Sequence, residues 1–408
     1  MRMRRGGTSG DATFRVAKVP LSSAAWLLES SGRSMTHSIH FRSAALALGA
    51  AVVSAVQAHE VAPSGAPSGS KPVPIRFEVE TRGPVAAPSK VEAAYNIPVS
   101  GQGFWKFTPV VGAMSLPVEA LPKLKGAHGT VLVDYERDVI YWGLENVGWV
   151  GFSNHFKSSW VVKGDPAFSR GNLHGADIFP RPGKPALIAA ADNNEGEVYV
   201  TDTTFQKAHV LKHPPGKEYA DGKGFAPTDV AFTDKNTVFV TDGYGRAFFM
   251  PADVEPFKYR GEIFGGKSVS QTPHGITFDP IHKDLIVSAR PEAQVRHWSL
   301  NKKAWLDVQG LPPGSTVCDT DVWGDYVMAA CLDGPKGSPG PIYVINQKRR
   351  AVVSTIKPKE DLGYATAQHM HDACWYVPGK GKNGEVYIIF TAWNPGGIGV
   401  LRLANVPN

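Results

Sequence analysis

The sequence predicts an all-β fold, a six-bladed β-propeller with one four-stranded blade per repeat. Apolar and polar residues alternate along many short segments, and polar turns separate these segments. A shared pattern recurs six times, with register positions near residues 128, 174, 229, 274, 319 and 371. The intervals of 45 to 55 residues between these positions suit a blade of four short strands.

The N-terminal region has the composition of an export signal. Residues 43–56 are largely apolar and follow Arg42, and Val56-Gln57-Ala58 places small residues at the expected cleavage position. The apolar stretch is too short to span a membrane as a helix. We therefore expect residues 1–58 to be a signal region, with Met35 as an alternative start. The mature protein would begin near His59, be secreted or periplasmic, and carry no membrane anchor.

Two further regions complete the expected domain organisation. Residues 59–90 are rich in Pro, Ser and Ala, which is typical of an extended linker. Residues 91–408 would form the propeller. Within it, residues 97–99 and 104–107 could supply an outer strand that pairs with residues 398–403 and closes the ring.

The repeat is clearest in the third and fourth blades. Residues 226–232 and 237–244 alternate apolar and polar side chains around a polar turn, and residues 273–278 and 284–290 repeat this arrangement. Residues 197–202 and 209–212 do the same in the second blade. This local pattern resembles the NHL-type propeller repeat. Propellers host hydrolases, lyases and binding modules alike, so the repeat alone does not determine the function.

The overall composition excludes some partners. The net charge of +6 is mild for this length, and no Lys/Arg cluster with interleaved aromatic residues occurs, so we expect no nucleic-acid binding. Cys318 and Cys331 flank a hairpin turn near residues 323–325, which would place them opposite one another. Either a disulfide inside one blade or two buried thiols would satisfy this arrangement, with Cys374 left free.

Three histidines carry the strongest chemical signal. His174, His274 and His371 each stand at the start of a strand-like segment, in the second, fourth and sixth repeats. Alternate blades around a sixfold axis would place three imidazoles in a ring that faces the central channel. Catalytic zinc requires such a set, three protein ligands and an open coordination position.

With these residues, the chain resembles the peptidyl-α-hydroxyglycine α-amidating lyase family over residues 120–403. The resemblance is carried by short motifs in four repeats: residues 173–175 with 200–202, 227–231 with 240–244, 273–275 with 288–290, and 368–372. It implies a six-bladed propeller with zinc on His174, His274 and His371. It also implies a catalytic Tyr244 and an Arg290 beside the substrate. The family's structural calcium would fall on Asp372 and on the backbone carbonyls of Thr130 and Ala176.

The resemblance also implies a reaction. Zinc would act as a Lewis acid on the hydroxyl of a small or peptide-derived carbinolamide. Tyr244, with its pKa lowered by the dication and by Arg290, would remove the hydroxyl proton. The C–N bond would then break to an amide and an aldehyde or keto acid, which is glyoxylate in the family.

The chain departs from the family at three points. The family's first-blade arginine is absent from residues 141–146, where Glu145 would instead repel a substrate carboxylate. His369 replaces the family's methionine two residues before the last histidine, and this chain carries no monooxygenase domain. Arg170 or Arg246 would have to supply the missing positive charge.

Two other functions are compatible with the same fold. A calcium-dependent lactonase or esterase would use carboxylate ligands in the channel, and Asp229, Asp319 and Asp372 lie in or near the register. A non-catalytic propeller would bind protein or carbohydrate through aromatic residues on its rim. The tryptophans that could form such a rim are Trp142, Trp149, Trp160, Trp375 and Trp393. We expect most of them to pack between blades instead, because large aromatic side chains fill the wedges of a propeller.

Overall fold

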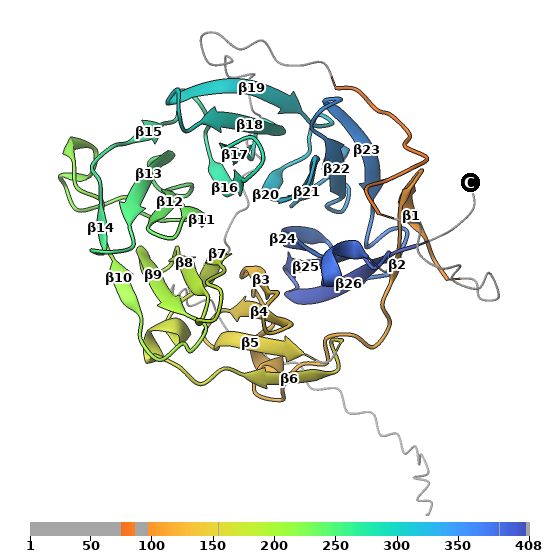
Figure 1. Ribbon diagram of the computed structural model, residues 1–408, viewed down its shortest axis with the longest axis horizontal. Coiled ribbons are helices and arrows are strands. Elements are labelled where there is room, and N and C mark those ends of the chain that lie inside the picture. Colours follow the sequence, from red (N-terminus) through yellow and green to blue (C-terminus); the bar gives the residue numbers. More distant parts are fainter. Residues whose placement is uncertain (1–74, 86–96, 154, 383, 405–408) are drawn as a thin grey trace, which may run out of the picture. The chain divides into compact units, whose positions relative to one another are not determined.

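The computed structural model describes residues 75–85, 97–153, 155–382 and 384–404, which belong to one compact unit. Six antiparallel sheets are arranged around a central channel (Figure 1), so the expected six-bladed, all-β propeller is confirmed. In the described ranges, helical structure is limited to short 3-10 turns, and no helix is long and apolar enough to cross a bilayer. These turns are η1 (Leu121–Lys123), η2 (Pro166–Ser169), η3 (Lys217–Tyr219), η4 (Pro335–Gly337) and η5 (Pro378–Gly381).

The first three blades each begin with the strand nearest the channel. Blade 1 contains β3 (Val131–Asp134), β4 (Val139–Leu144), β5 (Gly148–Ser153) and β6 (Ser158–Val161). Blade 2 contains β7 (Leu173–Phe179), β8 (Leu187–Asp192), β9 (Glu197–Asp202) and β10 (His209–Leu211). Blade 3 contains β11 (Asp229–Asp234), β12 (Thr237–Thr241), β13 (Phe248–Asp253), β14 (Lys258–Tyr259) and β15 (Phe264–Gly265).

The remaining blades follow the same plan, and the sixth uses both ends of the described chain. Blade 4 contains β16 (Pro273–Asp279), β17 (Asp284–Ala289), β18 (Gln294–Ser299) and β19 (Ala304–Gly310). Blade 5 contains β20 (Val317–Trp323), β21 (Tyr326–Cys331), β22 (Ile342–Asn346) and β23 (Ala351–Ile356). Blade 6 contains β24 (His369–Tyr376), β25 (Tyr387–Trp393), β26 (Gly397–Leu403), β2 (Trp105–Pro109) and β1 (Ser100–Gln102).

The ring closes where N-terminal strands join the last blade. In β2 and β26, Phe107 lies opposite Leu403 and Pro109 opposite Leu401, which confirms the expected closing strand. Figure 1 shows orange β2 beside blue β26. Residues 97–99, which were expected to contribute, lie outside the strands, and β1 continues the sheet beyond β2 instead.

Part of the expected linker lies against blade 5. Phe77 pairs with Val352 of β23 in a parallel bridge. The Glu80 carboxylate is buried and accepts hydrogen bonds from Trp105 Nε1 (2.9 Å) and Asn346 Nδ2 (2.7 Å). Residues 75–85 therefore connect the closing strand to the neighbouring blade. The expected signal region, residues 1–58, lies outside the described residues, as do residues 59–74 and 86–90 of the expected linker.

The hydrophobic core lies between neighbouring blades. Inner strands such as β22 are buried on both faces, whereas outer strands such as β6 alternate between exposed and half-buried residues. This pattern arises because each blade packs face to face against the next. Trp142, Trp149 and Trp375 are at most 3% exposed and belong to this packing, so they are not available to a rim surface.

In four blades, a bulge interrupts the first strand at the position that the predicted histidine ligands occupy. The extra residue is His174 in β7, Cys318 in β20 and His371 in β24, and the bulge in β16 includes His274. A bulge turns a side chain out of the regular alternation. It therefore allows these residues to face the channel while the rest of each strand keeps its pairing.

The bulge also changes the cysteine pairing. Cys331 lies opposite Val317, so the expectation that Cys318 and Cys331 are directly opposite is wrong. All three cysteines are buried and free in the structure. A Cys318–Cys331 disulfide thus stays a prediction that the register does not favour.

Candidate metal centre in the central channel

The structure brings the three predicted histidines together. His174, His274 and His371 are 1–3% exposed. Their ring centroids are 4.8 Å apart for His174 and His274, 4.4 Å for His174 and His371, and 5.1 Å for His274 and His371. Three imidazoles from blades 2, 4 and 6 therefore surround one point of the channel.

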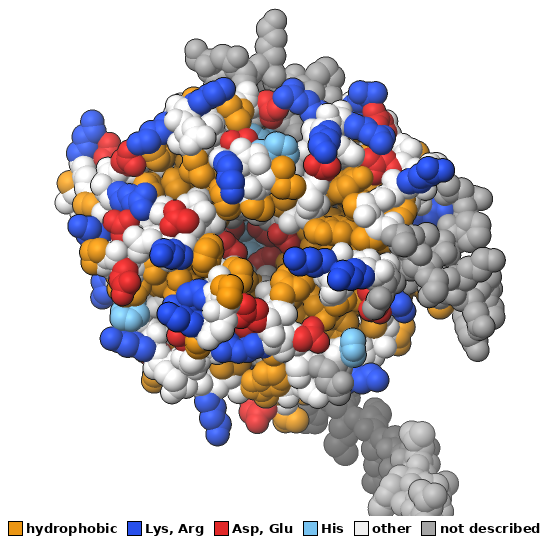
Figure 2. All heavy atoms as spheres, viewed as in Figure 1, with side chains coloured by type: hydrophobic (Ala, Val, Ile, Leu, Met, Phe, Trp, Pro, Cys, Tyr) orange, Lys and Arg blue, Asp and Glu red, His pale blue; other side chains and the backbone are white. Residues whose placement is uncertain are grey.

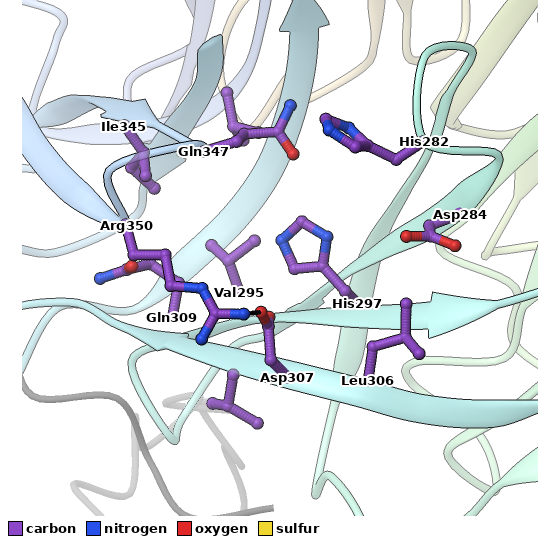
Figure 3. A pocket seen from close by; sticks show the side chains of 12 residues that line it. His282, Asp284, Val295, His297, Leu306, Asp307, Gln309, Ile345, Gln347 and Arg350 are labelled. Carbon is purple, nitrogen blue, oxygen red and sulfur yellow. Dashed lines mark ion pairs between the residues drawn. The ribbon is translucent and has the colours of Figure 1, made fainter. Parts of the chain in front are cut away.

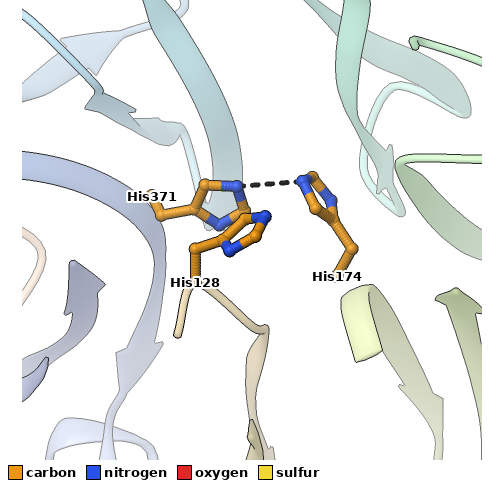
Figure 4. A group of neighbouring side chains, drawn as sticks. All are labelled: His128, His174 and His371. Carbon is orange, nitrogen blue, oxygen red and sulfur yellow. Dashed lines mark hydrogen bonds between the residues drawn. The ribbon is translucent and has the colours of Figure 1, made fainter. Parts of the chain in front are cut away.

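A fourth imidazole, His128, joins this group. Its ring centroid is 5.2 Å from that of His174 and 5.1 Å from that of His371. The candidate ligand atoms of His128, His174 and His371 all lie within 4.8 Å of one another (Figure 4). Sequence reasoning placed His128 in the repeat register but not among the ligands, because it considered alternate blades only.

Backbone carbonyls determine the tautomers of three of these rings. His174 Nδ1 lies 2.7 Å from Thr228 O, His274 Nδ1 lies 2.9 Å from Cys318 O, and His128 Nδ1 lies 2.8 Å from Gly126 O. A carbonyl oxygen only accepts, so each Nδ1 carries the proton and each Nε2 keeps its lone pair. Metal-binding histidines are commonly oriented by such a bond from the other ring nitrogen.

These contacts also correct the repeat register. His174 and His274 contact equivalent carbonyls in the next blade, those of Thr228 and Cys318. The residues equivalent to the histidines are therefore Thr228 and Cys318, one position before the expected Asp229 and Asp319.

The donor set fits a divalent transition metal. His371 Nε2 lies 3.1 Å from His174 Nε2, and His371 Nδ1 is buried without a hydrogen-bond partner among the described residues. Two nitrogens bound to a tetrahedral zinc ion would lie about 3.3 Å apart. Burial, then the neighbouring histidines and Arg290, lowers the pKa of His371 well below its usual value. The ring is therefore neutral and available as a ligand.

Tyr244 and Arg290 lie against the histidines. The Tyr244 hydroxyl is 2.9 Å from His274 Nε2 and 3.2 Å from His174 Nε2, and Arg290 Nη1 donates to it at 3.0 Å. Because both imidazole nitrogens are acceptors, the Tyr244 hydroxyl carries a proton that it donates to one of them. The Tyr244 ring is 41% exposed at the channel mouth, while its hydroxyl points inward.

The protein's own groups do not lower the pKa of Tyr244 as expected. Burial raises the pKa of the Tyr244 hydroxyl, and the positive charge of Arg290 opposes this effect only in part. The geometry thus presents Tyr244 as a proton donor.

The other expected cations lie elsewhere. Arg170 pairs with Glu197 at 3.6 Å, and Arg246 pairs with Asp221 at 2.6 Å. Glu145 accepts a hydrogen bond from Asn194 at 3.0 Å. Neither Arg170 nor Arg246 therefore replaces the family's first-blade arginine beside the histidines.

His369 and Trp393 extend the aromatic wall beyond His128. The Trp393 ring lies 5.9 Å from that of His128 and 5.7 Å from that of His369, whose Nδ1 contacts Asp333 Oδ1 at 3.0 Å. Neither residue was assigned to the site from sequence, because their contacts depend on how β24 and β25 pair.

A cavity of about 500 Å³ occupies the opposite end of the channel. Tyr244 and Arg290 come after β12 and β17, the second strands of blades 3 and 4. These second strands end at the edge of the blade where the first strands begin. The other ends of the first strands line the cavity, so Tyr244 and Arg290 lie at the opposite end of the channel from it. Figure 2 shows acidic and hydrophobic side chains around the central hollow. The acidic residues that line the cavity are Asp134, Glu136, Asp177, Asp229, Asp319, Asp321 and Asp372.

Most of these carboxylates join neighbouring blades. Each of four accepts a hydrogen bond from a backbone amide in the first strand of the next blade. These pairs are Asp177 with Phe232 N (2.7 Å), Asp229 with Ile276 N (2.7 Å), Asp321 with Trp375 N (2.7 Å) and Asp372 with Val131 N (3.1 Å). A structural role accounts for their presence without a metal.

The residues expected to bind calcium are only partly brought together. Asp372 and Ala176 line the cavity. Thr130 is fully buried, and its carbonyl oxygen accepts a hydrogen bond from Gly143 N at 2.9 Å. Calcium binding stays a prediction.

A separate, smaller pocket lies between blades 4 and 5 (Figure 3). Its volume is about 190 Å³, and its walls include His282, His297 and Asp307. Arg350 forms an ion pair with Asp307, and His282 contacts Asp279 at 2.7 Å. Because Arg350, Asp307 and His282 are already paired in this way, the histidine cluster in the channel is the better candidate for chemistry.

Comparisons with known proteins extend the fold assignment. No protein-family model and no curated protein sequence matches the chain. The structure is similar to that of a gluconolactonase from Xanthomonas campestris, with a TM-score of 0.53 and 11% identity over 79% of this chain and 99% of that chain. The likeness shows the propeller fold alone.

A second structure with similarity is hydrazine synthase from Kuenenia stuttgartiensis. It has a TM-score of 0.40 and 14% identity, over 54% of this chain and 56% of that chain. The comparisons do not support a specific amidating-lyase family.

Proposed function

We propose that this protein is a metal-dependent hydrolase that opens a lactone or ester of a small anionic molecule at the histidine end of the channel. The observation that carries this proposal is the convergence of neutral imidazoles, the Tyr244 hydroxyl and Arg290 on one point. A propeller that only binds partners through its rim has no need of this arrangement.

The residues of the chain suit carbonyl addition. A bound divalent metal would supply Lewis-acid chemistry, polarising the carbonyl group and lowering the pKa of water. Tyr244 offers a hydroxyl proton to the oxygen that gains negative charge as the carbonyl is attacked. Arg290 donates to the Tyr244 oxygen, keeps that hydroxyl aimed at the histidines and attracts an anionic substrate.

The choice of a lactone or ester draws support from two sources. The structure has the fold of a gluconolactonase, although at 11% identity this likeness concerns the fold only. Burial, which raises the pKa of the Tyr244 hydroxyl, also suits a donor better than a base. Zinc is the metal we propose, because a set of histidine nitrogens is typical of its catalytic sites.

A second candidate is cleavage of a carbinolamide, as in the amidating lyases. The observation in its favour is that His174, His274, His371, Tyr244 and Arg290 converge as that resemblance implies. In this reaction Tyr244 would act as a base, which requires a bound metal to favour its phenolate.

The test combines metal analysis with two assays. We would measure metal content of the purified protein, then hydrolysis of gluconolactone and cleavage of an α-hydroxyglycine derivative. The His174→Ala variant should lose the metal and the activity, whereas His213→Ala, at an exposed histidine, should keep both. Cleavage of the glycine derivative alone would favour the lyase. Absence of a transition metal from the active protein would overturn both candidates.

A further inference from the structure

We infer that His128 is a fourth ligand, so that the metal centre is formed by four histidines from blades 1, 2, 4 and 6. The inference rests on the proposed metal-dependent function and concerns the ligand set of that same site. With four protein ligands, the substrate or water would take a fifth coordination position. It departs from the three-histidine arrangement of alternate blades that the repeat pattern predicts.

The topology of the ring brings His128 to the cluster. Blade 1 lies between blades 6 and 2 and opposite blade 4 (Figure 1). His128 is therefore beside His371 and His174, and it faces His274 across the channel. Four imidazoles approach the same point from four directions.

The ring separations suit four ligands around one ion. Two imidazoles that bind one zinc ion have zinc–nitrogen distances of about 2.0–2.1 Å. When the angle between the two zinc–nitrogen bonds is a right angle or tetrahedral, the ring centroids lie about 4.5–5.2 Å apart. The separations of His128 from His174 and from His371 are 5.2 and 5.1 Å. The ring-centroid separations among His174, His274 and His371 range from 4.4 to 5.1 Å. His128 is thus about as close to His174 and His371 as the three predicted ligands are to one another.

The protonation of His128 leaves the required lone pair. Its Nδ1 donates to Gly126 O, so its Nε2 is an acceptor. Asn172 Nδ2 donates to this nitrogen at 3.1 Å and also to Asn193 Oδ1 at 2.9 Å. When a cation takes the His128 lone pair, Asn172 keeps its bond to Asn193. Asn172 is fully buried and holds the ring at the cluster, so we assign it a positioning role.

The structure offers a control for this assignment. His369 lies near the same mouth, and its ring is 5.7 Å from that of Trp393. Its Nδ1 is already paired with Asp333 at 3.0 Å. A histidine that merely lines the channel mouth should behave as His369 does, whereas a ligand should behave as His174 does.

The experiment measures metal binding by the full chain, without reference to activity. We would determine the Zn²⁺ affinity by competition with a chelator and record the visible spectrum of the Co²⁺-substituted protein. His128→Ala should weaken Zn²⁺ binding by at least roughly tenfold, since even residues that only orient ligands contribute about 10- to 100-fold. It should also change the Co²⁺ bands, and His369→Ala should change neither property.

A second variant guards against misfolding and tests ligation directly. His128→Cys replaces the imidazole with another zinc ligand, so Zn²⁺ affinity should recover relative to His128→Ala. The Co²⁺ form should gain a thiolate charge-transfer band. The contrary outcome is that His128→Ala keeps the wild-type Zn²⁺ affinity and Co²⁺ spectrum, while His174→Ala loses the metal. That result would overturn the inference that His128 is a ligand and would leave the proposed function unaffected. No metal binding by the wild-type protein would overturn both.

Discussion

At the scale of single residues, hydrogen bonds decide what the site can do. Carbonyl oxygens of neighbouring segments hold the proton of His128, His174 and His274 on Nδ1, which leaves a lone pair on each Nε2. The same bonds make the imidazoles acceptors and Tyr244 a donor. The chemistry of the site therefore depends on backbone groups whose identity the sequence does not reveal.

Removing the Tyr244 hydroxyl should slow the reaction without removing the metal. Loss of one donor to a developing oxyanion costs about 10²- to 10³-fold in kcat. We expect Tyr244→Phe to show a decrease of this size, with unchanged metal content because Tyr244 is not a proposed ligand. Steady-state kinetics and elemental analysis of the same sample would check this. A Tyr244→Phe enzyme with wild-type kcat would exclude Tyr244 from the reaction.

At the scale of strands, a bulge and an interblade hydrogen bond accompany most functional positions. Bulges at His174 and His371 turn these side chains toward the axis. A few residues further along the same strands, aspartates such as Asp177 accept a backbone amide from the next blade. First strands thus carry the proposed ligands at one end and interblade contacts at the other.

The buried aspartates should make stability depend on pH. Burial raises the pKa of Asp177 to about 6 and that of Asp321 to about 7. An unfolded aspartate has a pKa of about 3.9, so between pH of about 4 and about 7 the folded protein binds more protons. The contribution of these aspartates to the free energy of unfolding should therefore fall as the pH rises through this window. Buried histidines such as His371, whose pKa is lowered by burial, contribute in the opposite direction.

Urea unfolding at several pH values between about 4 and about 8 would measure this effect. Asp321→Asn should reduce the slope, because an amide does not titrate. The amide keeps only one oxygen to accept from the backbone amides of Val322 and Trp375, so the variant should be less stable at low pH, where the Asp321 carboxyl is itself neutral. An unchanged slope in this variant would show that other groups are responsible.

At the scale of the whole molecule, closure of the ring maintains the geometry of the site. His371 lies on β24 of blade 6, the sheet that β2 and β1 complete. Trp105 of β2 is fully buried between blades 5 and 6, with its ring 4.6 Å from that of Tyr326 and 5.6 Å from that of Trp375. A side chain far from the channel thus supports the position of a proposed metal ligand.

Truncating this side chain should destabilise the entire propeller. Trp→Ala substitutions in a core cost about 3–5 kcal/mol, and Trp105→Ala also leaves Glu80 without one of its donors. Trp160→Ala is the matched control, because Trp160 is 38% exposed, and we expect a much smaller cost there. Urea unfolding of the two variants would compare them. Equal stability of both would contradict a structural role for the closing strand.

The periodic features of this protein could be predicted from its sequence. Alternation of apolar residues, turn residues and a repeat of 45 to 55 residues indicated six blades, and the histidines at equivalent positions indicated a shared site. These features are local, because each blade repeats the same requirement for two buried faces. The pairing of Trp105–Pro109 with the last blade was also predictable, since β26 needs a partner.

What the tertiary structure alone decided is which residues meet. His128 joins the cluster because blades 1, 2 and 6 are neighbours once the ring is closed, although residues 128 and 371 are far apart in the chain. Cys318 and Thr228, rather than Asp319 and Asp229, occupy the histidine register: their carbonyl oxygens contact His274 and His174, and in β20 a bulge sets Cys318 apart from the regular pairing. Sequence periodicity specifies the blades, whereas closure and bulges determine the contacts between them.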